Sequence, residues 1–435
     1  MLDAREARAD MQRRLTDEYG LPLICFTMNI AGEVKDSPLI RLMFNEGVRR
    51  LRALPYDIRY ALVQHGITGP TAYFVLSGGA QELKRAAVMI EDAHPAFRLF
   101  DIDVMDADGR KLSRSAARRC MVCQGPAKEC ARSRAHGLDA VKGAQDGLLK
   151  CFAAEYLGRL AARALTVEVE ATPKPGLVDA ANNGAHNDMD ISTFRASIAA
   201  LEPYFTKFAL SGLKHGQTGG LMPELVQTGI EAECAMLSAT GGVNTHRGAI
   251  YSLGLLLAAA GIRFASACDL SITELAAQLA SLDIKTRPDA ADTHGAAVRR
   301  NYGVTGVRGE AASGFRLALT AAELFSGYSS RMDEHAAAVL TLPHIMAGLT
   351  DTNLLHRGGE EGLSYVKAGS AAICALDERD RPGALKRMDG ECIKRNLSPG
   401  GSADMLGLAI FLSLCGPLFQ NAAERFPMRR FGPPD

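Results

Sequence analysis

From residue 150 onward, the sequence is dominated by Ala- and Leu-rich stretches that are separated by Gly and short polar segments. Alanine and leucine have high helix propensity, and runs of β-branched residues, which favour strands, are few. The helix-forming stretches are, in chain order, residues 147–164, 192–210, 221–238, 249–260, 272–281, 314–325, 334–349 and 403–414. This pattern predicts an all-α, multi-helix domain over residues 150–435.

Residues 1–140 mix helical and strand patterns instead. Short apolar segments with the length of strands occur at residues 21–29, 72–76 and 96–104. Segments with helical patterns occur at residues 5–19, 39–54 and 81–92. We therefore predict an α+β domain with a small mixed sheet of about four strands, and a domain boundary within residues 137–147.

Charge and hydropathy indicate which classes of partner the protein binds and in which cell compartment we expect it. The 49 Lys and Arg residues balance the 49 Asp and Glu residues, so no overall charge attracts nucleic acid or an anionic membrane. The apolar runs at residues 249–262 and 405–419 are shorter than the roughly 20 residues that a bilayer requires, which favours buried core helices. The N-terminus is charged and resembles no signal peptide, and most cysteines are scattered singly. We expect a cytoplasmic enzyme that binds neither nucleic acid nor membrane.

The polar loop Thr172–Asp190 (TPKPGLVDAANNGAHNDMD) is the first candidate site of the helical part. Lys174 between two prolines is a candidate phosphate ligand. Asp188 and Asp190 are candidate Mg²⁺ ligands, because Mg²⁺ prefers one or two carboxylates together with substrate phosphates. Asn183 and His186 are further candidate contacts. The structural alternative is an ordinary loop in which the Asp and Asn side chains cap a helix.

Further polar residues lie beside glycines at the expected helix ends. Such positions suit anions, because helix N-termini present unpaired N–H groups. The candidates are Asn244, His246, Arg247, Asp292, His294, Arg299, Arg308, Glu310, Asp351, Asn353 and Asp404. Asp292, His294 and Glu310 are the candidates for acid–base or metal chemistry, and the arginines for clamping phosphates. Each motif alone fits a capped helix end, but their recurrence predicts one shared polyphosphate pocket.

Taken together, six motifs in this order resemble triphosphoribosyl-dephospho-CoA synthase. They are TPKPGLVD with NNGAHNDMD, GGVNTHRGAI, DTHG, YGVTGVRGEAASGF, DTNLLHRGG and LSPGGSADML, and they cover about residues 150–435. The resemblance implies ATP and 3′-dephospho-CoA as substrates: a ribose hydroxyl attacks C1 of the ATP ribose, adenine leaves, and the triphosphate stays on the product. Which carboxylate acts as base and which as metal ligand remains open.

The N-terminal part carries its own candidates. Asp101 and Asp103 lie two apart on an expected strand, so both face the same side and can hold one Mg²⁺. The alternative is an exposed strand with alternating charge. Asn29 and Lys35 follow another strand, where they can contact a phosphate. Arg8 and Gln12 share a helix face upstream.

Three cysteines and a histidine cluster in the segment RCMVCQGPAKECARSRAH. Their spacing is C-x2-C-x6-C-x5-H, which places Cys120, Cys123, Cys130 and His136 within one short segment. Three thiolates and an imidazole can bind Zn²⁺ tetrahedrally. The alternative is a set of buried or functional thiols.

The motifs NxxGxxK, DID and RxCxxC with CARSRAH resemble apo-citrate lyase phosphoribosyl-dephospho-CoA transferase, over most of residues 1–140. The resemblance implies transfer of the phosphoribosyl-dephospho-CoA group to a serine of the acyl carrier (gamma) subunit of citrate lyase. The product of the second domain is then the substrate of the first. Two alternatives remain: the same cofactor system serving malonate decarboxylase, or an N-terminal domain that only docks the carrier protein.

Overall fold

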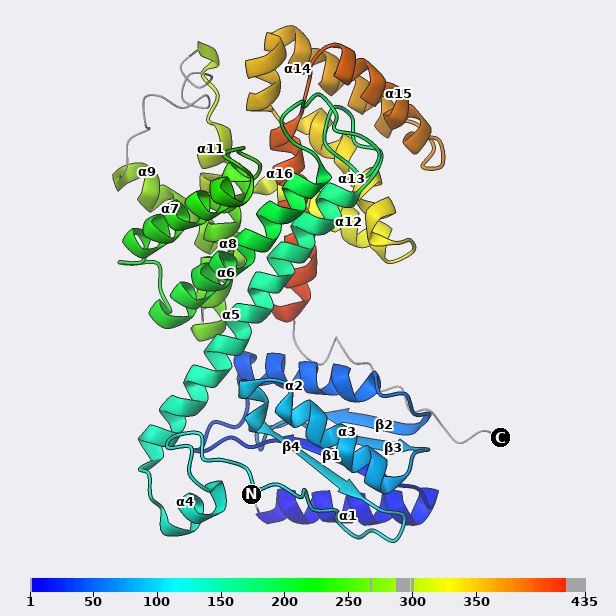
Figure 1. The fold of residues 1–435 in the computed structure, drawn as a ribbon, viewed down its shortest axis with the longest axis vertical. Coiled ribbons are helices and arrows are strands. Elements are labelled where there is room, and N and C mark those ends of the chain that lie inside the picture. Colours follow the sequence, from blue (N-terminus) through cyan, green and yellow to red (C-terminus); the bar gives the residue numbers. More distant parts are fainter. Residues whose placement is uncertain (1, 267, 287–297, 299–300, 420–435) are drawn as a thin grey trace. The chain divides into compact units, whose positions relative to one another are not determined.

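The computed structural model describes residues 2–266, 268–286, 298 and 301–419. The chain divides into two compact units, Met1–Ala153 with Leu418–Asp435, and Ala154–Pro417. The division falls inside one long helix, α5 (Leu138–Glu170). The N-terminal unit is α+β and the C-terminal unit is helical, which confirms the predicted fold class (Figure 1).

The N-terminal unit is built on a four-stranded sheet with the strand order β2-β3-β1-β4. Its elements are α1 (Leu2–Tyr19), β1 (Leu23–Met28), α2 (Pro38–Arg52), β2 (Ile58–Gln64), β3 (Thr71–Leu76), α3 (Ala80–Asp92), the 3₁₀ helix η1 (Pro95–Leu99), β4 (Phe100–Met105) and α4 (Ala127–Ser133). All three strand pairings are antiparallel, so the expectation of a mixed sheet was wrong. The short connection between β2 and β3 makes them a hairpin, which is necessarily antiparallel.

Two details of the strands differ from the pattern in the sequence. The edge strand β2 was not predicted, because its residues are partly exposed on both faces and show no clean alternation. The predicted strand 96–104 begins only at Phe100, since Pro95 starts a 3₁₀ turn in its first half.

The sheet is covered on both faces (Figure 1). Leu15 of α1 packs in a cluster with Cys25 and Tyr73 on one face. On the other face, the ring of Phe26 stacks on that of Phe44 from α2 at 4.8 Å. Because Cys25 is directly opposite Asp103 in the register, the two aspartates of β4 lie on the α1 side.

The C-terminal unit contains the remaining helices. Within the described residues they are α6 (Ile191–His215), α7 (Met222–Ala239), α8 (Arg247–Ala265), α9 (Ile272–Thr286), α11 (Gly306–Ala312), α12 (Arg316–Ser329), α13 (Glu334–Gly348), α14 (Thr352–Cys374), α15 (Arg381–Lys394) and α16 (Gly400–Cys415), and the 3₁₀ turn η2 (Gly416–Phe419) follows at the division between the units. Each predicted helical stretch falls largely within one of these helices or α5. The sequence pattern did not indicate α14 and α15, because α14 is interrupted at Gly359 (φ 60°) and α15 carries few apolar residues.

The core of this unit is organised around α8, which is buried along most of its length and packs against α6. Glycines allow the two backbones to approach closely: a Cβ at Gly212 would lie 2.0 Å from the carbonyl oxygen of Ala258. Two segments, Arg247–Ala265 and Gly400–Phe419, are long and apolar enough to span a membrane, but 78% and 56% of their apolar windows are buried in the protein. Such burial is typical of core helices in a globular domain.

Candidate functional sites

A cavity of about 990 Å³ lies in the C-terminal unit, where three helices begin. The N-terminal residues of α8, α14 and α16 line it, together with the C-terminal part of α5 and residues 303–310. Glycines let these ends pack tightly, since a Cβ at Gly248 would lie 2.1 Å from an Asp404 oxygen and one at Gly400 would lie 2.6 Å from the Asn353 amide. Unpaired N–H groups at helix N-termini favour anionic ligands.

Most of the predicted site residues that the structure describes in this unit meet at the cavity. Those that line it are Lys174, His186, Asn244, His246, Arg247, Arg308, Glu310, Asp351, Asn353 and Asp404. Asn183 is exposed and does not line it. Asp292, His294 and Arg299 lie outside the described residues. Motifs that are up to 230 residues apart in the chain (174 to 404) therefore border one space.

The two aspartates predicted to bind Mg²⁺ here are not among the residues that line the cavity. Asp190 is the N-cap of α6 and forms a capping box, in which its Oδ1 accepts hydrogen bonds from the Thr193 amide (2.9 Å) and the Ser192 hydroxyl (2.6 Å). These bonds lower the pKa of Asp190 to about 2. The Asp188 side chain is 64% exposed. Asp190 therefore takes the alternative role, helix capping, whereas Asp188 lies 3.7 Å from His186 of the cavity wall and its role in binding Mg²⁺ stays a prediction.

Lys174 is held by a buried acid. Its ammonium group donates a 2.6 Å hydrogen bond to Glu168 Oε1 of α5, and both side chains are at most 4% exposed. Burial raises the pKa of Glu168, while the charge of Lys174 opposes this shift. The cation predicted to bind phosphate is therefore already paired.

Replacing Lys174 with alanine should destabilise the C-terminal unit by about 3–5 kcal/mol, because Glu168 would be left as an unpaired buried charge. The measurement is the unfolding midpoint in denaturant, followed by far-UV circular dichroism. The control is Lys394→Ala, which breaks an exposed pair with Glu391 and should leave the unfolding midpoint nearly unchanged. A K174A protein as stable as the control would show that the pair is dispensable for folding.

Two further acids line the cavity near this pair, and they differ in their surroundings. Asp351 is 1% exposed and accepts hydrogen bonds from the amides of Asn353 and Ser402, so it joins the starts of α14 and α16. Asp404 has no hydrogen-bond partner in the described part of the chain and faces the cavity. Burial, then the charges of Glu168 and Asp351, raise the pKa of Asp404 well above its usual range. Among the described residues Asp404 is thus an unengaged acid, and its surroundings favour the neutral form of its carboxyl group.

Two histidines are neutral at the cavity wall. His246 is 2% exposed, and burial lowers its pKa to about 3. Its Nδ1 lies 2.7 Å from the Ser197 hydroxyl, whereas its Nε2 has no partner among the described residues. His186 Nε2 lies 2.8 Å from the Ser398 hydroxyl, and burial and the neighbouring Arg357 lower its pKa. The Nδ1 of His186 lies 3.3 Å from Arg357, so both of its ring nitrogens have partners, and only His246 keeps a ring nitrogen that can form a hydrogen bond to a ligand without adding charge.

The cavity also contains arginines, each with a partner inside the protein. Arg308 binds Asp283 (2.7 Å), and Arg357 donates to the Ala185 carbonyl (2.9 Å). Arg247 forms an ion pair with Glu233. Glu310 lines the same wall, and burial raises its pKa. The site thus combines cations, helix N-termini and acids with raised pKa values.

Sequence reasoning missed Glu168 and Asp283. Each is an acid in an otherwise apolar helical stretch, outside the motifs themselves: Glu168 precedes TPKPGLVD, and Asp283 precedes DTHG. An acid at such a position indicates a buried ion pair, since carboxylates are rarely buried alone. That was the only signal available.

The N-terminal unit holds a second candidate site on the α1 side of the sheet. The side chains of Asp101 and Asp103 share a face, as their spacing predicted, while Ile102 between them is buried on the other. Burial, and then the charge of Asp103, raise the pKa of Asp101. Lys111 donates a 2.6 Å hydrogen bond to Asp103 Oδ2. Arg8 and Gln12 of α1 lie near Cys25, which pairs with Asp103 in the register.

The predicted phosphate ligands Asn29 and Lys35 lie in the loop after β1. Gln145 fixes this loop, with its amide donating to the Asn29 carbonyl (3.0 Å) and accepting from the Ala31 amide (2.9 Å). The ammonium of Lys35 donates to the Ile30 carbonyl. Among the described residues, no hydrogen bond joins Asn29 or Lys35 to the aspartate pair of β4.

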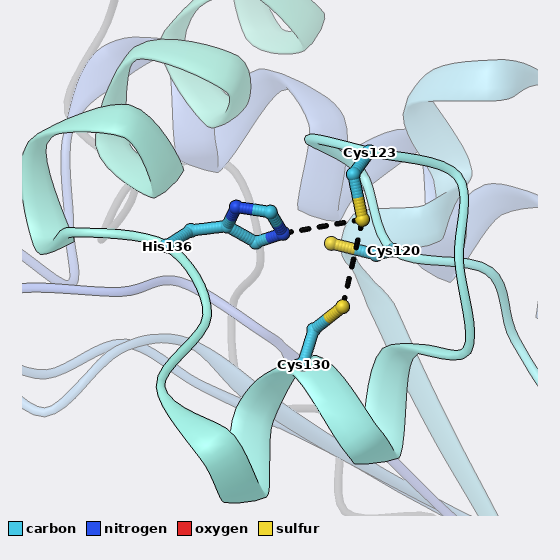
Figure 2. Close-up of side chains that lie close together, drawn as sticks. All are labelled: Cys120, Cys123, Cys130 and His136. Carbon is cyan, nitrogen blue, oxygen red and sulfur yellow. Dashed lines mark hydrogen bonds between the residues drawn. The ribbon is translucent and has the colours of Figure 1, made fainter.

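The predicted cysteine–histidine cluster is compact (Figure 2). The ligand atoms of Cys120, Cys123, Cys130 and His136 all lie within 4.8 Å of one another. It is the only such group of three or more potential metal ligands that the described residues form.

Comparisons with known proteins match both parts of the chain. Residues 1–151 match the family described as apo-citrate lyase phosphoribosyl-dephospho-CoA transferase, and residues 154–422 match ATP:dephospho-CoA triphosphoribosyl transferase. Protein CitXG of Haemophilus influenzae is 38% identical over 94% of both chains. Protein CitXG of Leuconostoc mesenteroides is 32% identical over 95% of this chain and 96% of its own. The 2-(5″-triphosphoribosyl)-3′-dephosphocoenzyme-A synthase of Pectobacterium atrosepticum is 43% identical over 58% of this chain and 86% of its own.

Proposed function

Because the chain belongs to the CitXG family, we propose that the cavity of its C-terminal unit makes the citrate lyase prosthetic group and that the β4 aspartates take part in attaching it. The chain is a bifunctional transferase. It converts ATP and 3′-dephospho-CoA to 2′-(5″-triphosphoribosyl)-3′-dephospho-CoA and adenine, and then transfers the phosphoribosyl-dephospho-CoA group to a serine of an apo acyl carrier, releasing diphosphate. The observation that carries this function is the match of both families, in order, within one chain.

For the first reaction, we assign acid and base to two carboxyl groups of the cavity. The ribose 2′-hydroxyl of dephospho-CoA attacks C1 of the ATP ribose, the bond from C1 to adenine breaks, and adenine must gain a proton. Asp404 suits this proton donation because burial and the neighbouring acids raise its pKa and so favour the protonated form that can donate. Glu310, whose pKa burial also raises, suits removal of the hydroxyl proton. The negative charge of the Asp404 carboxylate, which develops as its proton is transferred to adenine, favours the cationic ribosyl transition state.

The triphosphate needs positive charge and N–H donors. The starts of α8, α14 and α16 supply the N–H groups that Asn244 and Asp351 do not already cap, and Arg247, Arg308 and Arg357 line the same space. Mg²⁺ would accompany ATP as a complex with its phosphates, a form that needs few protein carboxylates. His246 Nε2 and the Asn353 amide can then orient the sugars through neutral hydrogen bonds.

For the second reaction, the serine hydroxyl of the carrier attacks the phosphate next to the added ribose, and diphosphate leaves. Asp101 and Asp103 fit a Mg²⁺ ion, because their two carboxylates lie on the same face of β4. They are also close enough that the charge of Asp103, after burial, raises the pKa of Asp101. Such an ion would neutralise the departing diphosphate. Arg8 and Lys111 add positive charge close to the pair.

The family matches favour citrate lyase over malonate decarboxylase, and a transferase over a docking module, for the N-terminal unit. We propose the gamma subunit of citrate lyase as the carrier. We also propose a cytoplasmic location, since ATP and dephospho-CoA are substrates and clustered free thiols suit a reducing compartment.

The complete chain should release one adenine per dephospho-CoA consumed when it is incubated with ATP and Mg²⁺, and it should then increase the mass of added apo carrier. Adenine is measured by liquid chromatography and the carrier by intact mass spectrometry. Omitting dephospho-CoA should prevent both changes, whereas omitting the carrier should prevent only the second. Adenine release without dephospho-CoA would contradict the assignment, since it would show plain hydrolysis of ATP.

A further inference from the structure

We propose that Cys120, Cys123, Cys130 and His136 form a structural Zn²⁺ site that folds residues 106–136 of the N-terminal unit. The sulfurs of Cys123 and Cys130 are 3.5 Å apart, and His136 Nε2 lies 3.2 Å from Cys123 Sγ (Figure 2). Ligands placed about 2.1–2.3 Å from a tetrahedral Zn²⁺ lie roughly 3.5–3.8 Å from one another. The four groups are therefore arranged close to the size of a zinc coordination shell.

The backbone around the first two cysteines is shaped to present their sulfurs. Arg119 and Pro126 form a β-bridge, so the chain between them is a tight loop. Within it, the Val122 amide donates to Cys120 Sγ (3.4 Å), and Gln124 adopts a positive φ of 63°. N–H groups that point at a sulfur stabilise a thiolate, which is the form that binds a metal. This loop therefore favours metal-binding thiolates over inert thiols.

The third and fourth ligands are positioned by α4 and the turn that ends it. Cys130 lies within α4, and Arg134 ends the helix in the left-handed conformation (φ 49°). The Ala135 amide then returns to the Cys130 carbonyl (3.1 Å). This turn brings His136 back toward the three sulfurs, as Figure 2 shows.

The segment lacks the apolar core that would otherwise stabilise it. From Asp106 to Ala144, Cys120 is the only buried residue, and α4 contains no buried residue. A short segment without a core needs a disulfide or a metal to fold stably. All three cysteines are free thiols, with the sulfurs of Cys123 and Cys130 unbonded at 3.5 Å, so all three are available to a metal. Three thiolates with one imidazole are the ligand set of structural zinc sites.

A folded segment would in turn hold the strand that carries the aspartate pair. Arg118 donates to the Phe100 carbonyl at the start of β4 (2.8 Å) and pairs with Glu91, which accepts from the Ile102 amide (3.0 Å). Zinc loss should therefore loosen β4 and slow carrier modification while leaving adenine release unchanged. This activity readout depends on the proposed function; zinc content does not.

The complete chain, purified under reducing conditions from zinc-supplemented medium, should contain about one zinc per chain by plasma mass spectrometry. Cys130→Ser and His136→Ala should lower this content at least about tenfold. The matched control is Cys151→Ser, an exposed cysteine of the same unit outside the cluster, which should retain the metal. A wild-type chain without zinc, or equal loss from C151S, would overturn the proposal.

Metal-stripped wild type provides a second measurement if the variants fail to fold. Trypsin should cut the basic segment between residues 110 and 134 much faster after chelation, and Zn²⁺ but not Mg²⁺ should restore protection. Co²⁺ added to the stripped chain should give the visible absorption of a tetrahedral thiolate site. Protection that is unchanged by chelation, together with no Co²⁺ spectrum, would show that the segment folds without a metal.

Discussion

Replacing Asp404 with asparagine should lower the rate of adenine release by about 10²–10⁴-fold, the usual contribution of a positioned acid or base. Asparagine keeps the size and polarity of the side chain but cannot give adenine a proton. Dephospho-CoA and ATP should still bind, because the helix N-termini and arginines around the cavity are unchanged. The measurement is the initial rate of adenine formation at saturating substrates.

The pH profile should identify the role of Asp404. Since its pKa is raised, the protonated and active form exists below that pKa and disappears as the pH rises through it. The wild-type rate should therefore fall on the alkaline side, and D404N should lose this decline. A variant that recovers the wild-type rate at high Mg²⁺ would instead identify Asp404 as a metal ligand.

Asp377→Asn is a suitable control, since its side chain is 75% exposed and does not line the cavity. It should release adenine at the wild-type rate. If D404N matched this control at every pH, the proposed acid would be wrong, and Glu310 would become the first candidate for both proton transfers.

Much of the helical unit was predictable because helix formation depends on local sequence. Ala- and Leu-rich stretches ended by glycine gave most of its helices, including the buried α8. The meeting of the motifs at one cavity was also predictable from the sequence. Glycine and polar residues at a helix end are typical of anion binding, and their recurrence at several helix ends indicated one shared ligand. Helix α14 could not be predicted in this way, because Gly359 interrupts the helical pattern within it.

The roles of individual side chains were less predictable, because the partners come from elsewhere in the fold. Asp190 and Asp351 have similar sequence surroundings to Asp404, yet both are engaged in capping helices while Asp404 remains free. Lys174 pairs with Glu168, an acid from the preceding helix that carries no motif. Only packing decides which polar residue is satisfied within the protein and which is left for a substrate.

Replacing Asp103 with asparagine should lower the rate of carrier modification by about 10²-fold or more, while adenine release continues at the wild-type rate. The substitution removes one of two carboxylates proposed to hold Mg²⁺ and leaves Lys111 without its partner. Since the helical unit still works, the triphosphoribosyl intermediate should accumulate with one molecule per adenine released. Mass spectrometry of the small molecules and of the carrier measures both.

The matched control is Asp108→Asn, an exposed aspartate just beyond β4 whose side chain is 72% exposed. It should modify the carrier normally, because its side chain pairs with the exposed surface residue Arg110 and not with the β4 aspartates. Full carrier modification by D103N would show that the two β4 aspartates are simply an exposed strand face. Loss of adenine release as well would contradict the assignment of the two reactions to separate units, since β4 belongs to the N-terminal unit alone.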